Sequence, residues 1–126
     1  MSLSDNIAIL DKGTLVQQGT PKDLYFNPAN YFAATLTGKI NKIHLDGSNY
    51  LVRPEWITLA AINDEKTDSS KLAQILSVDF LGAVIRYKLS WQNQIIYADS
   101  FASAYQHFSS GQYVYLEITQ KQKSTS

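Results

Sequence analysis

Gly38 and Lys39, in the stretch "TGKI", are the residues that come nearest to a phosphate-binding loop. Such a loop needs a glycine five positions before Gly38, so that backbone N–H groups cradle a phosphate, and a serine or threonine after the lysine to reach magnesium. The chain has Ala33 and Ile40 at these two positions. The segment therefore predicts a helix end followed by a surface lysine, and we expect it to bind no ATP.

The other residues that could do chemistry are scattered along the chain. His44 and His107 are far apart, and neither has a second ligand at the spacing of a metal site. The acidic residues Asp79, Asp99 and Glu117 lie on predicted strands, with no two close in sequence. No serine occupies a G-x-S-x-G turn. We therefore predict no catalytic residue, no cofactor and no metal ligand in this chain.

The charge and aromatic content of the chain indicate which partners it could bind. Eleven basic residues balance eleven acidic residues, and the chain has no cysteine. A net charge of zero removes the electrostatic attraction that dominates nucleic-acid binding. The eight Tyr, five Phe and two Trp residues could stack on the bases of single-stranded nucleic acid. They could equally well fill the core and the rim of a small β-barrel. We expect no nucleic-acid partner, although a small ligand-binding or oligonucleotide-binding barrel stays open as an alternative.

The first region, residues 1–38, predicts a β-hairpin followed by two short helices. "NIAIL" and "TLVQQG" are extended runs joined by the turn signal "DKG". Thr20 and Asp23 have the spacing of a helix cap, and Pro21 fits the first helical position. The stretch "PANYFAATLTG" predicts a second helix that ends near Gly38. Such a hairpin is only marginally stable by itself, and we expect Ile7, Ile9, Leu15 and Val16 to be exposed. We therefore predict a homodimer or higher assembly in which residues 5–37 contact a neighbouring chain.

The second region, residues 39–121, predicts a small antiparallel β-barrel. Apolar and polar residues alternate along several short segments, and we predict six or seven half-buried strands. These strands span residues 40–45, 49–53, 56–60, 72–80, 83–90, 94–100 and 112–119. We expect a closed barrel with Phe80, Leu89, Leu116 and Ile118 inside, so the fold class is mainly β. Residues 122–126 are polar and predict a disordered tail.

The first region resembles the closing segment of the ATP-binding subunit of ABC transporters, in the branch of iron(III), polyamine and maltose-type importers. The family pattern has a strand, a glycine-turn hairpin ending Gly-Thr-Pro, and an aromatic helix ending in glycine. Asn6 departs from it, because the family usually has arginine there. The matching positions are Asp5, Ile7, Ile9, Leu10, Gly13, Gly19, Thr20, Pro21, Asp23, Leu24, Tyr25, Pro28, Phe32 and Gly38.

The second region resembles the TOBE domain of the same family, an OB-like barrel. "VRPEWITL" is similar to its Arg-Pro-Glu signature, carried here by Arg53, Pro54 and Glu55. "ILSVDFLGAVIRYKL" resembles its strand–Leu-Gly–strand hairpin, with Gly82 at the turn. The resemblance makes these four residues candidates for contact with another subunit.

The Arg-Pro-Glu tripeptide has a structural interpretation as well. Proline fixes its own φ and holds Arg53 extended, so the tripeptide could simply join two strands while Arg53 and Glu55 pair locally. We favour this structural role over a subunit contact, because the sequence shows no set of further binding-site residues to accompany the tripeptide.

The resemblance implies that the parent protein is an enzyme and that this chain is an accessory region of it. The parent would be an ABC-type ATPase that uses ATP and Mg to energise import of a small solute, peripheral to the inner membrane on its cytoplasmic side. Its partners would be a second copy and the membrane-spanning subunits. This chain would be the accessory, regulatory and dimerisation region. The alternative is a stand-alone OB-like barrel that binds a small oxyanion or single-stranded nucleic acid.

Overall fold

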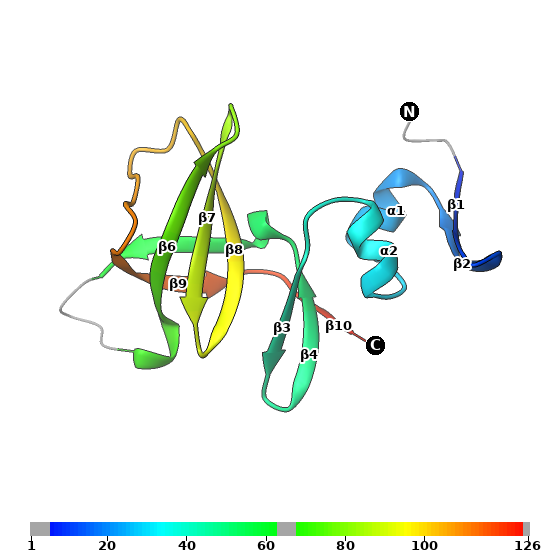
Figure 1. Ribbon diagram of the computed structural model, residues 1–126, viewed down its shortest axis with the longest axis horizontal. Helices are drawn as coiled ribbons and strands as arrows, with labels where there is room; N and C mark the ends of the chain where they lie inside the picture. The colour runs from blue at the N-terminus through cyan, green and yellow to red at the C-terminus, as the bar shows by residue number, and fades with distance from the viewer. Residues whose placement is uncertain (1–5, 63–67, 125–126) are drawn as a thin grey trace. The chain divides into compact units, whose positions relative to one another are not determined.

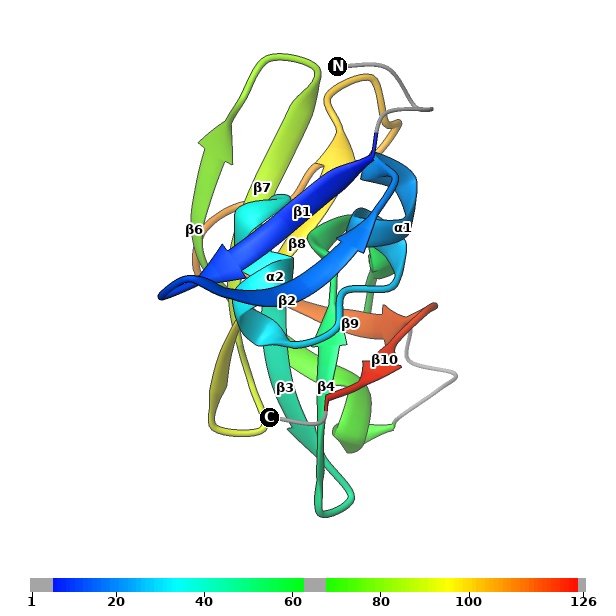
Figure 2. The same cartoon turned by 90° about the vertical axis from the view of Figure 1, so that its right-hand side faces the viewer.

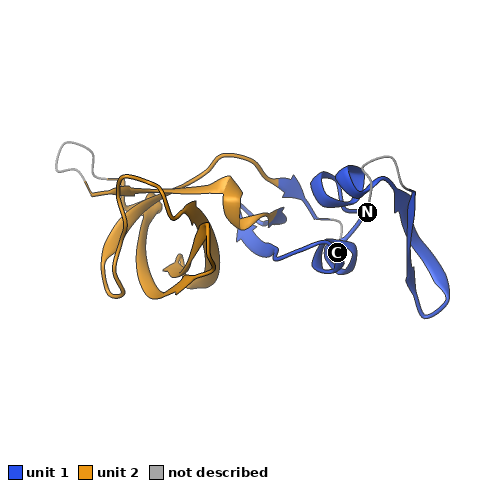
Figure 3. Cartoon of the chain, turned by 90° about the horizontal axis from the view of Figure 1, so that it is seen from above, with its two compact units in different colours: residues 1–51, 122–126 blue, residues 52–121 orange. Residues whose placement is uncertain are grey.

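The computed structural model describes residues 6–62 and 68–124 (Figure 1). They form two compact units, coloured separately in Figure 3. The N-terminal unit comprises residues 1–51 and 122–126, and the β unit comprises residues 52–121. Both are built from antiparallel strands and short helices, which confirms the predicted mainly β fold. The boundary after residue 38, which separates the segment that resembles an ABC nucleotide-binding domain from the segment that resembles a TOBE domain, stays a prediction.

The predicted hairpin is present at the start of the N-terminal unit. Strand β1 (Ile7–Asp11) pairs antiparallel with β2 (Thr14–Gly19), as Figure 2 shows. The connecting residues Lys12 and Gly13 have φ of 51° and 81°. Positive φ at both central positions gives the turn whose twist matches that of paired strands, and glycine adopts it without strain. The turn predicted from Asp11-Lys12-Gly13 is therefore confirmed.

Two capped helices follow the hairpin. Helix α1 (Pro21–Phe26) begins with the predicted capping box, in which Thr20 and Asp23 each accept from the other's backbone N–H. Helix α2 (Tyr31–Leu36) is capped by the Asn30 side chain. The side chain of Gln17 fixes the linker between them, because Nε2 donates to the Asn27 carbonyl at 2.9 Å and Oε1 accepts from Ala29 N at 2.7 Å.

The helices cover part of the hairpin, which corrects one prediction. Ile9 is only 5% exposed because it packs against Leu24 of α1 and Ala33 of α2. Ile7 and Val16 are half-buried against the same cluster. Of the four side chains expected to be exposed, Leu15 is the one that is, at 53%.

The N-terminal unit also contains a three-stranded sheet, which corrects the predicted disorder of the tail. Strands β3 (Asn41–Leu45) and β4 (Ser48–Val52) lie beside β10 (Gln122–Lys123), which pairs with β4. The Gln122 side chain donates to the carbonyl of Pro28 at 2.9 Å. A polar tail with no periodicity can still be ordered when a neighbouring strand has a free edge. Residues 125 and 126 lie outside the described part.

The β unit is a curled five-stranded antiparallel sheet in the order β5-β9-β6-β7-β8 (Figure 1). Two 3₁₀ turns, η1 (Pro54–Trp56) and η2 (Ser69–Lys71), precede β5 and β6. The burial of β7 alternates strictly, as its sequence predicted. The strands are β5 (Ile57–Ala61), β6 (Leu72–Phe80), β7 (Val84–Trp91), β8 (Gln94–Phe101) and β9 (Tyr113–Ile118).

The expectation of a closed barrel is wrong for the residues that the structure describes. Strands β5 and β8 are the two ends of the sheet and approach each other, but they do not pair. An OB-like fold is compatible with such a partly open sheet. The period-two pattern shows which face of a strand is inside, but closure depends on strand tilt and stagger, which that pattern does not encode.

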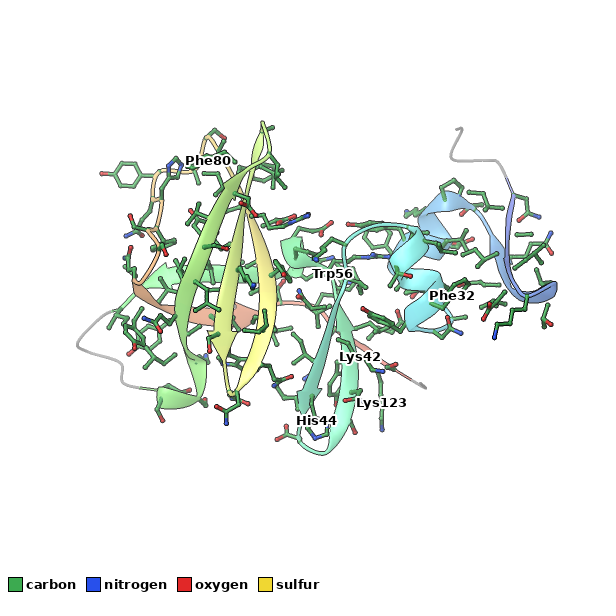
Figure 4. All side chains as sticks on the ribbon, in the orientation of Figure 1. Phe32, Lys42, His44, Trp56, Phe80 and Lys123 are labelled. Carbon is green, nitrogen blue, oxygen red and sulfur yellow. The ribbon has the colours of Figure 1, made fainter. Side chains whose placement is uncertain are left out.

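Two of the four predicted core residues are buried and two are not. Leu89 and Leu116 are 0% and 2% exposed, as predicted. Ile118 is half-buried. Phe80 is 72% exposed, and Figure 4 places it at the far end of β6. Phe80 pairs with the buried Ile85 across the sheet and so shares its face, but at this end β6 pairs with β7 and not with β9, which pairs with β6 at residues 72–74.

Candidate functional site

The Arg-Pro-Glu tripeptide is mostly internal. Arg53 is 0% exposed and precedes η1, whose first residue, Pro54, is buried as well. Glu55 is exposed. Because a guanidinium is always charged, its complete burial requires acceptors around it, and Arg53 does have interaction partners in the structure. Of the three residues, Glu55 alone has a side chain that another subunit can reach without rearrangement.

Glu55 lines a groove between the two ends of the open sheet, which we call the seam groove. It has a volume of about 430 Å³. Apolar side chains such as Ile57, Phe101 and Phe108 contribute to its walls, and Glu55 and Asp99 supply two carboxylates. Its described lining contains no lysine or arginine. The seam groove therefore has the wrong charge for an oxyanion.

An ion pair lies beside the seam groove. Arg86 on β7 and Asp99 on β8 are direct cross-strand neighbours. Arg86 Nε donates to Asp99 Oδ1 at 2.8 Å and Nη2 donates to Oδ2 at 2.9 Å, which is the bidentate geometry. The hydrogen bond to Asp99 raises the pKa of Arg86 above its ordinary value, and the charges of Asp99, Glu55 and Asp79 act in the same direction. The pair thus ties β7 to β8 next to Glu55.

Gly82 lies in the turn between β6 and β7 with φ of +86°. Leu81 N donates to the carbonyl of Val84 across this turn at 2.8 Å. Apart from Gly82 itself and the two residues adjacent to it in the chain, no atom lies within 4 Å of the position that a Cβ on Gly82 would occupy. The glycine is therefore required for its backbone conformation, and space is not the constraint.

We predict that Gly82→Ala lowers the free energy of unfolding by about 1–2 kcal/mol, because a Cβ is disfavoured at positive φ. Gly82→Asn is the matched control and should cost less, because asparagine tolerates this conformation. Urea denaturation of the two variants checks this. Equal losses would show that backbone conformation is not what the glycine supplies.

Four large apolar side chains are exposed at the end of the sheet that holds Gly82. We call this set the apolar tip: Phe80 (72% exposed), Leu81 (53%), Phe101 (71%) and Tyr105 (106%). The exposure of these four side chains was not predicted from the sequence. Phe80 was assigned to the core, and the other aromatic residues were considered either for the core and rim or for stacking on nucleic acid. The available signal was the absence of charge in "FLGAVI" and "SFASAYQ".

The N-terminal unit has an apolar groove of its own, with a volume of about 900 Å³. Side chains of β1, such as Ile7 and Leu10, line it together with α1 residues, such as Leu24 and Phe26. Leu10 is 57% exposed. This groove lies outside the four residues predicted to contact another subunit.

The residues first considered for chemistry have ordinary roles where the structure describes them. Gly38 and Lys39 follow the end of α2, and Lys39 is exposed. His44 Nδ1 lies 3.0 Å from Asn49 Oδ1, and His107 Nε2 lies 2.9 Å from the carbonyl of Ala102. Among residues 6–62 and 68–124, no group of three His, Cys, Asp or Glu side chains could hold a metal ion. The same residues form no helix long and apolar enough to cross a membrane.

Known proteins match most of the chain. It is 35% identical, over 83 residues or 65% of its length, to the spermidine/putrescine import ATP-binding protein PotA of Bacillus thuringiensis subsp. konkukian and, at the same level, to that of Bacillus anthracis. It is 30% identical over 102 residues, or 79% of its length, to the sulfate/thiosulfate import ATP-binding protein CysA of Pseudomonas syringae pv. tomato. The chain is similar to part of the ATP-binding subunits of ABC importers.

The match is to one part of such a subunit. It covers 25% of the PotA sequences and 30% of the CysA sequence. No protein-family model matches the chain. The similarity to the C-terminal portion of an ABC importer ATP-binding subunit, first seen in the hairpin and the Arg-Pro-Glu segment, is thereby supported by whole-sequence comparison.

Proposed function

We propose that this chain is the accessory, regulatory and dimerisation region of an ATP-binding subunit that energises import of a small solute. The observation that carries the proposal is the match of 65–79% of the chain to import ATP-binding proteins. The order of its two units supports it as well. A hairpin with two capped helices precedes an OB-like sheet, as the resemblance implies, and a stand-alone ligand-binding barrel has no need of that first segment.

In this proposal the parent protein is an ABC-type ATPase that uses ATP and Mg. It works with a second copy and with membrane-spanning subunits, on the cytoplasmic side of the inner membrane. The names of the relatives include polyamine and sulfate importers, so the solute of this system belongs to the broad class of small solutes that such proteins import.

An oxyanion-binding or nucleic-acid-binding barrel is the weaker candidate. The carboxylate of Glu55 in the seam groove would repel an oxyanion, and the carboxylate of Asp99 is paired with Arg86. The formal net charge of zero gives no attraction for a nucleic-acid backbone. We therefore assign no such ligand to the seam groove.

We predict that the chain by itself neither binds nor hydrolyses ATP. The segment around Gly38 and Lys39 lacks the glycine and the hydroxyl that would hold the phosphates and magnesium. Titration calorimetry with Mg-ATP should give no saturable heat, and a phosphate-release assay should give no turnover. Saturable binding at micromolar Mg-ATP would overturn this part of the proposal.

The dimerisation part is tested separately, by light scattering on the full chain. We expect the weight-average mass to rise towards that of a dimer as concentration increases. A mass that stays at 14.1 kDa up to roughly millimolar concentration would overturn it, since even a weak specific contact has a Kd below that.

A further inference from the structure

Strand β6 has an open edge near its C-terminal end. One edge of β6 pairs with β7 as far as Phe80, whereas the other edge pairs with β9 only at residues 72–74. The segment before β9 stays beside β6 a little further, because Ser110 Oγ donates to the carbonyl of Leu76 at 2.9 Å. Beyond that point no described strand pairs with this edge. Residues 77–80 therefore lack a partner strand on the side away from β7.

The backbone N–H and C=O groups of Val78 and Phe80 point out of this open edge. Leu81 N donates to the carbonyl of Val84 at 2.8 Å, so the backbone groups of Leu81 face β7. The direction alternates along an antiparallel strand, so the groups of Asp79 face β7 as well and those of Val78 and Phe80 face away. They have no hydrogen-bond partner in the described part of the chain. Such an edge is a template for another strand.

A groove runs along the same edge, and we call it the β6-edge groove. It has a volume of about 410 Å³. Its wall opposite β6 is anchored, because Phe108 N donates to the hydroxyl of the buried Tyr87 at 3.2 Å and the two rings meet edge to face. An anchored wall needs little further ordering when a ligand binds. The groove is lined by Leu76, Ser77, Val78, Phe80, Phe108, Ser109 and Ser110.

The side chains along the open edge alternate between the two faces of the sheet. Val78 and Phe80 pair with buried residues of β7, so their side chains lie on the inward face, where Phe80 is 72% exposed at the end of β6 (Figure 4). Asp79 lies on the opposite face. A strand added here alternates in the same way. Two of its residues would lie beside Val78 and Phe80, and the residue between them would lie beside Asp79.

Charge complementarity selects that middle residue. Asp79 is exposed, and its carboxylate forms no ion pair with any residue that the structure describes. Its cross-strand neighbour Arg86 is held by Asp99 through two hydrogen bonds, at 2.8 and 2.9 Å. The lining of the β6-edge groove carries no charge. An added strand is therefore favoured when it carries apolar residues towards the groove and a lysine or arginine beside Asp79.

We propose that the open edge of β6 binds an extended segment of another protein, in which a lysine or arginine stands between two apolar residues. The segment adds antiparallel to β6, in the position that β9 leaves vacant after residues 72–74. Main-chain hydrogen bonds to Val78 and Phe80 supply affinity, and the β6-edge groove and Asp79 supply specificity. The inference goes beyond the proposed function, because the partner has a different sequence and binding does not depend on dimerisation.

A designed peptide tests the proposal on the full chain. The probe is the acetylated and amidated peptide Ser-Thr-Val-Lys-Val-Thr-Ser, carrying a fluorescent label and titrated by fluorescence anisotropy. The same peptide with glutamate in place of lysine tests the charge. The same peptide with N-methyl groups on both valines tests the main-chain hydrogen bonds, because the valines are the residues that would pair with Val78 and Phe80.

Three variants of the chain complete the test. Asp79→Asn removes the carboxylate. Val78→Pro removes the outward N–H and keeps the bonds to β7, because proline is tolerated where a strand's N–H faces solvent. Ile95→Pro, on the end strand β8, is the matched control, since Ile95 is also exposed, at 53%. Circular dichroism checks that each variant is folded. If Val78→Pro does not fold, the N-methylated peptide decides the backbone test, because it leaves the chain unchanged.

We expect the lysine peptide to bind saturably with a Kd below about 1 mM. The glutamate peptide should bind at least about threefold more weakly, and Asp79→Asn should remove this difference. The N-methylated peptide should bind at least about tenfold more weakly and Val78→Pro should weaken binding at least about fivefold, because two hydrogen bonds and one are lost. Ile95→Pro should leave the Kd within about twofold.

Several results would overturn the proposal. Absence of saturable binding refutes the open edge as a peptide site. Equal affinity of the N-methylated peptide shows that no strand is added. A loss confined to Ile95→Pro places the peptide on β8 instead. If Val78→Pro weakens self-association in light scattering and leaves peptide binding unchanged, the edge belongs to a contact between copies.

Discussion

Replacing Arg53 with alanine is expected to lower the free energy of unfolding of the β unit by about 3–5 kcal/mol, as the loss of one member of a buried charged group does. Arg53 is fully buried and has interaction partners. Alanine would leave those partners unsatisfied and would open a cavity. Urea denaturation followed by tryptophan fluorescence measures the change, because Trp56 lies close by in sequence and is itself buried.

Two further variants test whether the loss comes from the guanidinium of Arg53. Arg53→Lys should recover little of the loss, because an ammonium cannot replace the planar set of donors of a guanidinium. Glu55→Ala should change the free energy of unfolding by no more than about 0.5 kcal/mol, as expected of an exposed residue. If Arg53→Ala leaves stability intact and weakens only self-association, the tripeptide acts as a subunit contact and its structural role is refuted.

Replacing Leu116 with alanine is expected to cost about 2–5 kcal/mol, the range for deleting a large buried side chain and leaving a cavity. Leu116 is 2% exposed and lies on β9, which pairs with both β5 and β6. A cavity at this position is bordered by three strands, so the site cannot close without shifting the sheet. Thermal and urea unfolding at low concentration measure the loss.

Phe80→Ala is the control for Leu116→Ala. Sequence alternation assigned both residues to the core, but Phe80 is 72% exposed. We expect Phe80→Ala to change the free energy of unfolding by no more than about 0.5 kcal/mol when the chain is monomeric. Equal losses in the two variants would mean that Phe80 is covered in solution and that the apolar tip is part of the core.

Local chemistry made several features predictable from sequence. The Asp11-Lys12-Gly13 turn and the Thr20/Asp23 capping box depend on residues only a few positions apart, so their types alone indicate the backbone conformation. The β strands of the β unit were predicted to within about two residues, because alternation records which face of each strand is inside. The family resemblance could also be recognised from the sequence, because it depends on the order of short motifs along the chain.

The tertiary structure decided the features that depend on distant segments. Ile9 is buried because two helices cover it, and Gln122 joins a sheet because β4 offers a free edge. Phe80 keeps the inward side that its sequence predicts, but at that end β6 pairs with β7 and not with β9, which pairs with β6 at residues 72–74. The same sheet is left open between β5 and β8. Alternation determines the side of a strand on which a residue lies; whether another segment covers that side depends on strand length and stagger, which only the assembled sheet defines.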